Sequence, residues 1–531
     1  MKRFVWTVMA ILVAVGLVVA IRTWRITSRQ PEPASATEPS PAPAIDLDAT
    51  LAEALQYKTV SYDEAPPDPE EQARAFDSFH AFLRTTFPRT LVMAERIAGH
   101  SLLVSLGPSP AVTIDGAAPA SGARIGAVPG GSGSAGASPS ASASANANAN
   151  RGAPGTSAPA KGSLMYAHLD VVPASADGWR ADPFGGTRDG DFIVGRGAID
   201  DKTSVIAILA ATESLLASGW TPARPVYLAF GDNEEAGGTS AAAIAQRLRD
   251  QGIQLESILD EGGAVVDKGI PGLGGRPIAA VAIAEKGVMN VEICATAAPG
   301  HSSTPPPTTA VGTLSTAIAR LEEHPPARTL NPLVRETLTY AAAEMSLGYR
   351  TLMANLWLAA PIIKSQMEKD HVSRALLGTS QAVTMVQGGV KANVLPERAC
   401  ATVNYRLFPG DTQKLVLDRI GTITKGLAVQ VSSRESVAPP APSNLDSAAG
   451  RILGRAIRSH FPYAVIVPVV SPGATDSRHF GGIAGQIFRF LPVHLSSEDL
   501  ASMHGVNERI STASLARAYA FYAEYVRAIG R

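Results

Sequence analysis

Cysteine is nearly absent from this chain of 531 residues, which contains Cys294, Cys400 and no others. Two cysteines make neither a disulfide framework nor a zinc site built from thiolates, so a metal would need other ligands. At most they form one bridge. Because both fall on predicted strands, we expect them to be buried free thiols.

An excess of charge of either sign is also missing. The chain has 46 Lys and Arg against 47 Asp and Glu, a formal net charge of −1. No basic field exists to attract nucleic acid, so we expect no nucleic-acid partner. The hydrophobic fraction of 45% in a chain of this length is enough for two sizeable domains.

A long hydrophobic run stands at the N-terminus. Residues 4–21 are apolar apart from Thr7 and Gly16, which is the length of a helix that crosses a bilayer. No small-residue cleavage site follows, so we expect residues 1–30 to be an uncleaved signal anchor and residues 31–45 a flexible tether. The balanced flanking charges do not fix the orientation. We expect a membrane-anchored protein whose catalytic part is extracytoplasmic, either periplasmic or extracellular.

A second stretch of biased composition covers residues 117–161. It consists mainly of Gly, Ala, Ser and Pro with an Asn-Ala repeat, and it has too little apolar surface to fold. Strand-like segments flank it on both sides. We therefore expect a disordered insertion within one domain.

Buried strands and helices alternate after residue 163. Apolar runs at 164–167, 226–230 and 255–259 predict strands, and helical patterns lie between them, the first ending near Ser218. This order is typical of an α/β fold, with a mostly parallel sheet covered by helices on both faces.

The pattern changes from residue 288 onward. Strand, helix, strand, strand and helix are predicted at 288–296, 310–323, 382–387, 397–407 and 412–425, which is the order of a ferredoxin-like α+β unit. The α/β pattern returns after Pro440, with a predicted helix at 445–461, strands at 465–470 and 486–490, and a helix at 514–529. We therefore predict a catalytic domain, residues 46–287 and 436–531, interrupted by a lid or dimerisation domain at 288–435.

An unusually apolar helical segment, residues 329–377, is inserted in the predicted lid. It has two interpretations: a cover over the active-site cleft, or ordinary core packing. Core packing is the simpler one.

Two adjacent glutamates, Glu234 and Glu235, follow the strand predicted at 226–230. The carboxyl ends of strands are where open α/β sheets bind ligands. Neighbouring carboxylates repel each other unless a cation or a shared proton offsets the charge. A metal on one glutamate, with the other free to move a proton, resolves the conflict. Taken alone, a solvated acidic turn explains the pair equally well.

Further oxygen and nitrogen donors recur at the ends of predicted strands: His168, Asp170, Asp200, Asp260, Glu261, Asp476, His479 and His504. Imidazole together with carboxylate suits zinc, manganese or cobalt. Taken singly, each donor is more simply explained as a surface or capping residue, and Asp200 stands where the N-cap of the following helix is expected. Their clustering favours two metals that share a carboxylate and generate hydroxide from water.

Six motifs carry a resemblance to a known family: His168-Leu169-Asp170-Val171-Val172-Pro173, Gly195-Arg196-Gly197-x-x-Asp200-x-Lys202, Asn233-Glu234-Glu235-x-Gly237-Gly238, Leu259-Asp260-Glu261-Gly262-Gly263, Pro299-Gly300-His301-Ser302-Ser303 and His504-Gly505-x-Asn507-Glu508. In order and spacing they resemble the M20 metallopeptidases over nearly all of the chain after Asp46. The forms around Asp201, Glu261 and His479 resemble the branch of carboxypeptidase S and the secreted N-fatty-acyl-amino-acid synthase/hydrolase.

The resemblance implies two metal ions, zinc in the first place, with manganese or cobalt as alternatives. It makes His168 and Glu235 terminal ligands of opposite metals, Asp200 the bridging carboxylate, and His504 a ligand of the Glu235 metal. The last ligand, on the His168 metal, is Glu261 or its neighbour Asp260.

The resemblance also assigns the remaining roles. Asp170 would fix the tautomer of His168, and Glu234 would be the general base. His301, from the lid, would stabilise the oxyanion across a dimer or after lid closure. Asn393 resembles a lid asparagine that binds the substrate end. Of the two arginines Arg406 and Arg478, either would pair with a substrate carboxylate, and a structural ion pair explains each equally well.

These features predict a membrane-tethered metal-dependent hydrolase of carboxypeptidase type. It would cleave a peptide or N-acyl-amino-acid amide bond next to a free carboxylate, using a water that bridges two metals. The alternative is an N-fatty-acyl-amino-acid synthase/hydrolase. A catalytically silent binding protein would lack a ligand or the base, and none is missing. The expected partners are small peptides or N-acyl amino acids, the membrane through the N-terminal helix, and a second copy through the lid.

Overall fold

The structure is a computed structural model of the whole chain, and it describes residues 1–33, 40–108, 161–267 and 270–531. The insertion predicted at 117–161 lies outside the described residues except for Lys161, and the tether predicted at 31–45 lies partly outside them. The N-terminal run forms α1 (Lys2–Arg25), which by length and composition is able to cross a membrane.

The largest sheet has ten strands among the described residues. Its four central strands run parallel in the order β6 (Val226–Gly231), β3 (Gly162–His168), β7 (Leu255–Asp260) and β17 (Ala484–Arg489). The other strands are β1 (Ala94–Ile97), β2 (Ser101–Leu106), β8 (Val265–Val266), β9 (Ile278–Glu285), β16 (Val465–Ser471) and β18 (His494–Leu495). The predicted mostly parallel sheet is confirmed, and the strands predicted at 164–167, 226–230, 255–259, 465–470 and 486–490 correspond to β3, β6, β7, β16 and β17.

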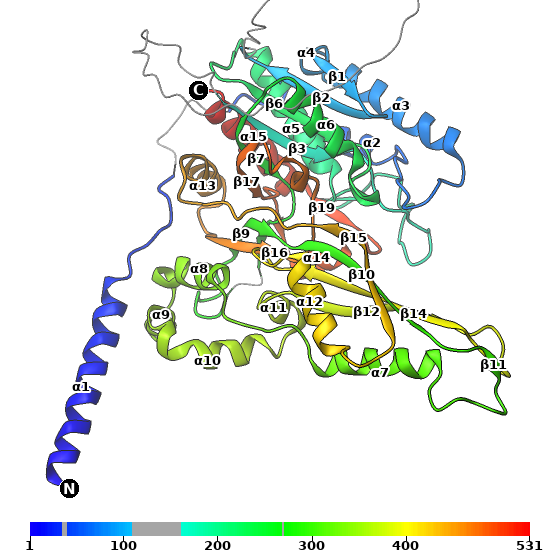
Figure 1. Cartoon of the computed structure of the whole chain (residues 1–531). Helices are drawn as coiled ribbons and strands as arrows, with labels where there is room; N and C mark the ends of the chain where they lie inside the picture. The colour runs from blue at the N-terminus through cyan, green and yellow to red at the C-terminus, as the bar shows by residue number, and fades with distance from the viewer. Residues whose placement is uncertain (34–39, 109–160, 268–269) are drawn as a thin grey trace, which may run out of the picture. The chain divides into compact units, whose positions relative to one another are not determined.

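Helices cover both faces of this sheet (Figure 1). On β3, Met165 and Ala167 pack in the cluster with α5 (Lys202–Ala217), α13 (Ala448–His460) and α15 (Thr512–Ile529). Tyr166 points the other way, into the cluster with α6 (Thr239–Asp250). A strand buried on both faces explains the continuous apolar runs of the sequence.

The first helix of the folded part is shorter than its pattern suggests. α2 (Leu47–Ala54) begins at its cap Asp46, whose carboxylate accepts from the backbone amides of Asp48 and Ala49. Helical spacing at 47–60 predicts a helix that continues to Val60, but Val60 instead bridges in parallel to Val171, so the chain must leave the helix. Helical spacing at 70–86 predicts a second helix, which is confirmed as α3 (Pro69–Thr86) and is followed by α4 (Pro88–Leu91).

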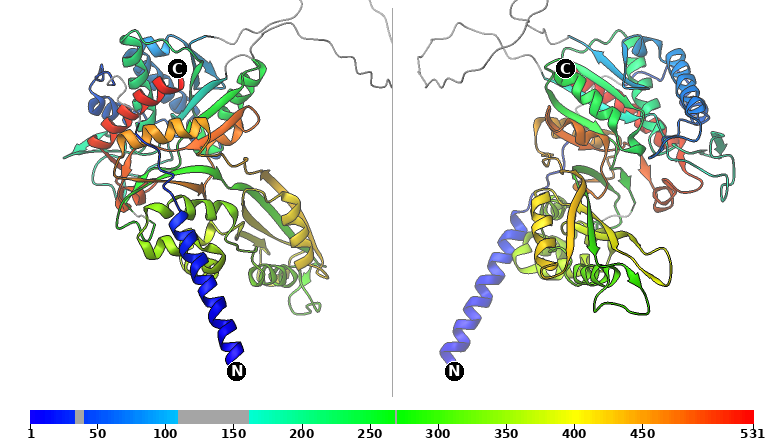
Figure 2. Two further views of the ribbon diagram at one scale, coloured as in Figure 1. Left: turned by 90° about the vertical axis from the view of Figure 1, so that its left-hand side faces the viewer. Right: turned by 45° about the vertical axis from the view of Figure 1, so that its right-hand side comes forward.

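A second sheet has four antiparallel strands in the order β12 (Ser380–Gly388), β14 (Arg398–Leu407), β10 (Gly287–Thr296) and β15 (Val429–Val437). α7 (Ala310–Glu323) and α12 (Gln413–Ile423) pack on it in one hydrophobic cluster (Figure 2). This is the ferredoxin-like arrangement that the sequence predicts. β15, the fourth strand, was not recognised from the sequence.

The prediction of free thiols is wrong, because a disulfide joins Cys294 and Cys400. Cys294 on β10 pairs in register with Cys400 on β14. Strand pairing register is a long-range property, which the local sequence around each cysteine does not contain.

The inserted segment forms α8 (Pro332–Tyr340), α9 (Leu347–Ala354), α10 (Leu356–Met367) and α11 (His371–Ala375). Val334 and Leu338 of α8 share a hydrophobic cluster with Val465 and Val467 of β16. The segment therefore packs on the main sheet, which favours core packing over a cover above the cleft.

Candidate metal centre

Three neighbouring parallel strands end at the same edge of the main sheet. β3 ends at His168 and β7 at Asp260, while β6 is followed by a short 3₁₀ helix over Glu234–Ala236. Parallel strands bring their carboxyl ends together, so these donors meet although they are far apart in sequence.

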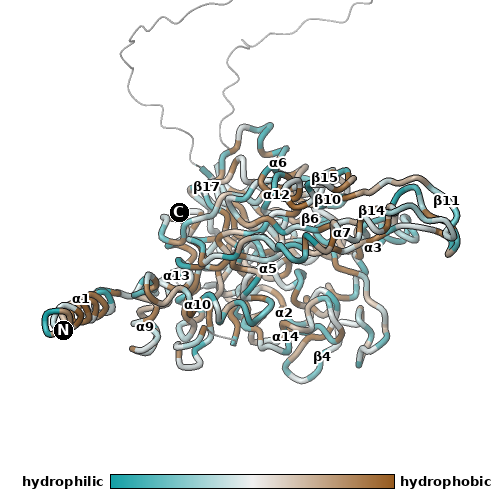
Figure 3. The backbone as a smooth tube through the Cα atoms, turned by 60° about the horizontal axis from the view of Figure 1, so that its bottom comes forward, coloured by the Kyte–Doolittle hydropathy of each residue, from teal (hydrophilic) through white to brown (hydrophobic). Residues whose placement is uncertain are grey.

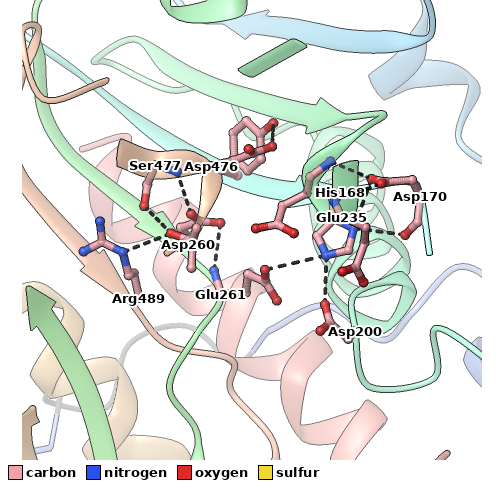
Figure 4. Close-up of polar contacts among 12 residues, drawn as sticks. His168, Asp170, Asp200, Glu235, Asp260, Glu261, Asp476, Ser477 and Arg489 are labelled. Atoms are coloured by element: carbon pink, nitrogen blue, oxygen red, sulfur yellow. Dashed lines mark hydrogen bonds and ion pairs between the residues drawn. The ribbon is translucent and has the colours of Figure 1, made fainter. Parts of the chain in front are cut away.

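His168 is fully buried at this edge (Figure 4). Its Nε2 atom lies 2.8 Å from Oδ1 of Asp200 and 3.6 Å from Oε1 of Glu261. Its Nδ1 atom lies 3.0 Å from the backbone oxygen of Asp170 and 3.3 Å from the carboxylate of the same residue. One ring nitrogen therefore faces two carboxylates, and the other is held by Asp170.

Asp200 lies between the two histidines of the site. Its second oxygen, Oδ2, is 3.0 Å from Nε2 of His504, and the same nitrogen is 3.1 Å from Oε1 of Glu235. Ligand atoms of His168, Asp200 and Glu235 lie within 4.8 Å of one another, as do those of a second group, His168, Asp201 and Glu261.

Asp170 connects His168 to the pair of glutamates. Its carboxylate accepts from the backbone amides of Glu234 (3.1 Å) and Glu235 (3.2 Å) and from the Ser61 hydroxyl (2.5 Å). The same fully buried carboxylate thus orients the imidazole and the turn that carries both glutamates.

Asp260 and Glu261, the rival ligands, point in different directions (Figure 4). Asp260 accepts from the backbone amide of Ser477 at 3.0 Å and from that of Glu261 at 2.9 Å. Glu261 faces His168 instead. Of the two acids, the structure brings Glu261 to the donor cluster.

The carboxylates at this edge outnumber the positive charges near them. Burial raises the pKa of Glu261 well above its usual range, and the charge of Asp200 adds to this rise. Burial also opposes ionisation of Asp200, but hydrogen bonds to His168 and His504 outweigh it and lower its pKa. Hydrogen bonds to Asp200 and Glu235 raise the pKa of His504 to about 10. A divalent metal ion would offset this excess of negative charge, and imidazole and carboxylate are ligand types that such ions prefer.

The sequence predicts no role for two buried acids near the donor cluster, Asp201 and Glu508. Asp201 is fully buried in the second donor group, and a cis peptide bond joins it to Asp200. Glu508 accepts from the backbone amides of Ile199 and Asp200 at 2.8 and 3.2 Å and forms a buried ion pair with Arg196 at 2.6 Å. Glu508 therefore positions the turn that carries Asp200.

A cavity of about 350 Å³ brings Glu234 together with both candidate arginines. The Arg478 guanidinium donates to the backbone oxygens of Thr475 and Gly237, each at 2.9 Å. Lys286, for which the sequence pattern predicts no role, lines the same cavity and donates to the backbone oxygen of Gly378 at 2.8 Å. Burial, and then the neighbouring Arg406, lower the pKa of Lys286 to about 8.

His301 and Asn393 lie together, but away from the donor cluster. His301 ends the short strand β11 (Gly300–His301), which pairs with β13 (Val394–Leu395), and Asn393 accepts from the Ser302 amide at 3.2 Å. Both residues are exposed, and Figure 1 shows β11 at the far end of the part of the molecule that contains β10 and β14. Among the described residues, no hydrogen bond or ion pair joins them to the donor cluster.

Known proteins share this sequence pattern and fold. Residues 164–528 match peptidase family M20/M25/M40. A probable carboxypeptidase S-like 2 from Dictyostelium discoideum is 32% identical, over 97% of this chain and 92% of its own length. The human N-fatty-acyl-amino acid synthase/hydrolase PM20D1 is 40% identical over 66% of this chain and 70% of its own length.

Solved structures agree on the fold. The M20 family metallo-carboxypeptidase Sso-CP2 from Sulfolobus solfataricus covers 92% of this chain and all of its own, with a TM-score of 0.59 at 18% identity. Human carnosine dipeptidase 1 covers 91% of this chain and 96% of its own, with a TM-score of 0.57 at 17% identity. The chain therefore belongs to peptidase family M20/M25/M40.

Proposed function

We propose that this protein is a membrane-tethered hydrolase that uses two zinc ions to cleave an amide bond next to a free carboxylate. The observation that carries the proposal is the position of Asp200, with one carboxylate oxygen toward His168 and the other toward His504. A carboxylate between two histidines, each accompanied by a further acid, is suited to bridge two metal ions.

The donors divide naturally into two sets around Asp200. His168 and Glu261 would hold one ion, and His504 and Glu235 would hold the other. Asp170 would fix the ring of His168, and Glu508 the turn that carries Asp200. When bound, the ions would polarise the scissile carbonyl and lower the pKa of a water molecule.

Glu234 is the proposed general base. It is adjacent to the proposed ligand Glu235 but lines the neighbouring cavity. Burial raises the pKa of Glu234 well above its usual range, and the charges of Asp476 and Asp200 add to the rise. A raised pKa makes a carboxylate a better proton acceptor near neutral pH, so Glu234 would take a proton from water and pass it to the leaving nitrogen.

Arg406 is the better candidate for the substrate carboxylate. It lines the cavity with Glu234, and no hydrogen bond or ion pair to another described residue holds its guanidinium. Arg478 in the same cavity already binds two backbone oxygens, which favours a structural role. The exposed pair His301 and Asn393 would complete the site only after lid closure, or from the lid of a second copy.

Two substrate classes fit the proposed site, because each presents an amide bond beside a carboxylate. A peptide is favoured by the identity to the carboxypeptidase S-like protein, which extends over 97% of this chain. An N-fatty-acyl amino acid, cleaved or formed, is favoured by the 40% identity to human PM20D1.

The proposed location is outside the cytoplasm, with α1 as a membrane anchor. The Cys294–Cys400 disulfide supports this location, because such bonds persist in oxidising compartments.

The experiment combines metal analysis with a substrate panel. The full chain is purified, zinc, manganese and cobalt per chain are measured by mass spectrometry, and hydrolysis of dipeptides and N-acyl amino acids is followed. We expect two zinc ions per chain, loss of hydrolysis on chelation and recovery with added zinc. Two bound metals without hydrolysis of any panel member would favour the silent binding protein, and a single metal would contradict the dinuclear site.

A further inference from the structure

Helix α10 is apolar on both of its faces. Leu356 and Ala359 are buried, whereas Trp357, Leu358 and Ile362 are 50%, 55% and 62% exposed. Leu358 and Ile362 are four positions apart and Trp357 adjoins Leu358, so the three side chains lie in one stripe along one side of the helix. A helix that is hydrophobic all round belongs in a protein core or a membrane, and among the described residues only one face of α10 has a protein core against it.

Helix α9 extends the stripe. Leu347, Tyr349 and Leu352 are also exposed. Residues 347–363 contain one charged side chain, Arg350, and no acidic residue. We call the six exposed residues of the two helices the α9–α10 surface: Leu347, Tyr349, Leu352, Trp357, Leu358 and Ile362.

This surface is continuous with the proposed membrane anchor. α9 packs beside the C-terminal part of α1, where Arg22 donates from Nε to the backbone oxygen of Ala354 at 3.2 Å. Figure 3 shows α1 as a mostly hydrophobic helix with α9 and α10 next to its C-terminal end. The apolar surface therefore begins where the anchor ends.

Asn355 forms hydrogen bonds to both α1 and α10. Its side-chain amide donates to the backbone oxygen of Val19 at 3.3 Å, and its side-chain oxygen accepts from the Trp357 indole at 3.2 Å. The indole thus stands next to the last turns of α1, which also carry the exposed Trp24. Tryptophan is enriched at membrane–water interfaces, where its ring is apolar and its N–H is polar.

We propose that the α9–α10 surface lies in the interfacial layer of the bilayer that α1 crosses. The partner is the lipid surface itself: acyl chains would cover the stripe, and the absence of acidic side chains suits phospholipid headgroups. The inference rests on the proposed anchoring by α1. It adds a second contact, which places the enzyme against the bilayer where an N-acyl amino acid would be dissolved.

The test uses the full chain in phosphatidylcholine–phosphatidylglycerol vesicles, with single cysteines labelled by an environment-sensitive fluorophore. Without reductant, the native cysteines stay in their disulfide and do not react. Leu358→Cys and Ile362→Cys report on the surface, and Leu12→Cys reports on the anchor. Val92→Cys, at a more exposed position on the main domain, is the control.

Lipids brominated at shallow or deep acyl carbons then quench the label. We expect labels 358 and 362 to be quenched most by shallow bromines, because interfacial helices lie about 5–10 Å into the headgroup–acyl boundary. Label 12 should be quenched most by deep bromines, and label 92 by neither.

Quenching at 12 without quenching at 358 and 362 would overturn the inference while leaving the anchor intact. Quenching at 358 and 362 alone would support the surface and contradict the anchor. A blue shift at 358 without quenching would show that a second copy of the chain covers the stripe, and equal quenching at 92 would show non-specific adsorption. Both of these outcomes overturn the proposal.

Discussion

Cys294 on β10 lies opposite Cys400 on β14, and a disulfide joins the two neighbouring strands at the centre of the four-stranded sheet. The residues are separated by 106 positions in sequence. The bond therefore closes a long loop that contains α7 and the inserted helices α8–α11. A crosslink of this kind restricts the unfolded chain much more than the folded one.

Reduction of this disulfide should lower the melting temperature of the protein. A loop of about 100 residues corresponds to about 4–5 kcal/mol in the chain-entropy model, and measured disulfides typically contribute about 2–4 kcal/mol. Melting is recorded with and without a reductant, and the Cys294→Ala/Cys400→Ala double variant, which should not respond, is the control. Two titratable thiols in the unreduced, unfolded wild-type protein would contradict the bond.

Acid should destabilise the fold through His80, a buried histidine on α3. Burial, and then the charge of Arg96, lower the pKa of His80 to about 4. The unfolded chain binds this proton near pH 6.5, whereas the folded chain does so only near pH 4, so stability falls as the pH drops through this window. The loss is at most about 3 kcal/mol.

Melting temperatures of wild type, His80→Asn and the exposed-site control His324→Asn are compared near neutral pH and near pH 5. The fall on acidification should be smaller in His80→Asn than in the other two proteins. An equal fall in all three would show that His80 is protonated in the folded protein.

The sequence predicts those parts of the molecule that depend on local pattern. The strand at 226–230 is apolar throughout because Phe230 and Tyr227 pack on opposite faces of the sheet. The donors follow the strands, and the shared edge of a parallel sheet brings them together. Sequence position therefore predicts the neighbourhood of His168, Glu235 and Glu261, whereas Asp200 precedes α5 and His504 follows α14 (Ser497–Ser502).

Long-range pairing is what the sequence does not predict. The Cys294–Cys400 bond depends on the register of β10 against β14. The choice of Glu261 over Asp260 depends on the Ser477 amide, which is more than 200 positions away and holds the Asp260 carboxylate. The place of His301 relative to the donor cluster depends on how the four-stranded sheet is positioned, which no local pattern encodes.

Glu508→Gln should weaken metal binding although Glu508 is not a proposed ligand. The carboxylate holds the amides of Ile199 and Asp200 and the buried guanidinium of Arg196. Residues behind metal ligands typically contribute about 10- to 100-fold in affinity. Zinc affinity is measured by competition with a chelator, on protein shown to be folded by circular dichroism.

The matched control for that variant is Glu213→Gln. Glu213 is a buried glutamate on α5 that accepts from the Thr90 amide at 2.9 Å and pairs with Arg89, away from the donor cluster. Both variants should lose stability, but only Glu508→Gln should lose zinc affinity. Equal zinc affinity in the two variants would show that Glu508 stabilises the fold without affecting metal binding.

The adjacent residues Glu234 and Glu235 should respond differently to substitution. Glu235 faces His504 in the donor cluster, whereas Glu234 lines the neighbouring cavity. Glu235→Ala should lose zinc as well as activity, because it removes a proposed ligand oxygen. Glu234→Gln should keep both zinc ions and the fold, because the amide is nearly isosteric with the carboxylate.

Glu234→Gln should nevertheless lower kcat by at least about 10²- to 10⁴-fold, because an amide does not accept the proton of the attacking water. Zinc per chain and kcat are measured for both variants under the same conditions. Zinc loss in Glu234→Gln with zinc retained in Glu235→Ala would exchange the two roles. Turnover of Glu234→Gln close to that of the wild type would refute the proton-transfer mechanism, because in that case a group other than Glu234 removes the proton.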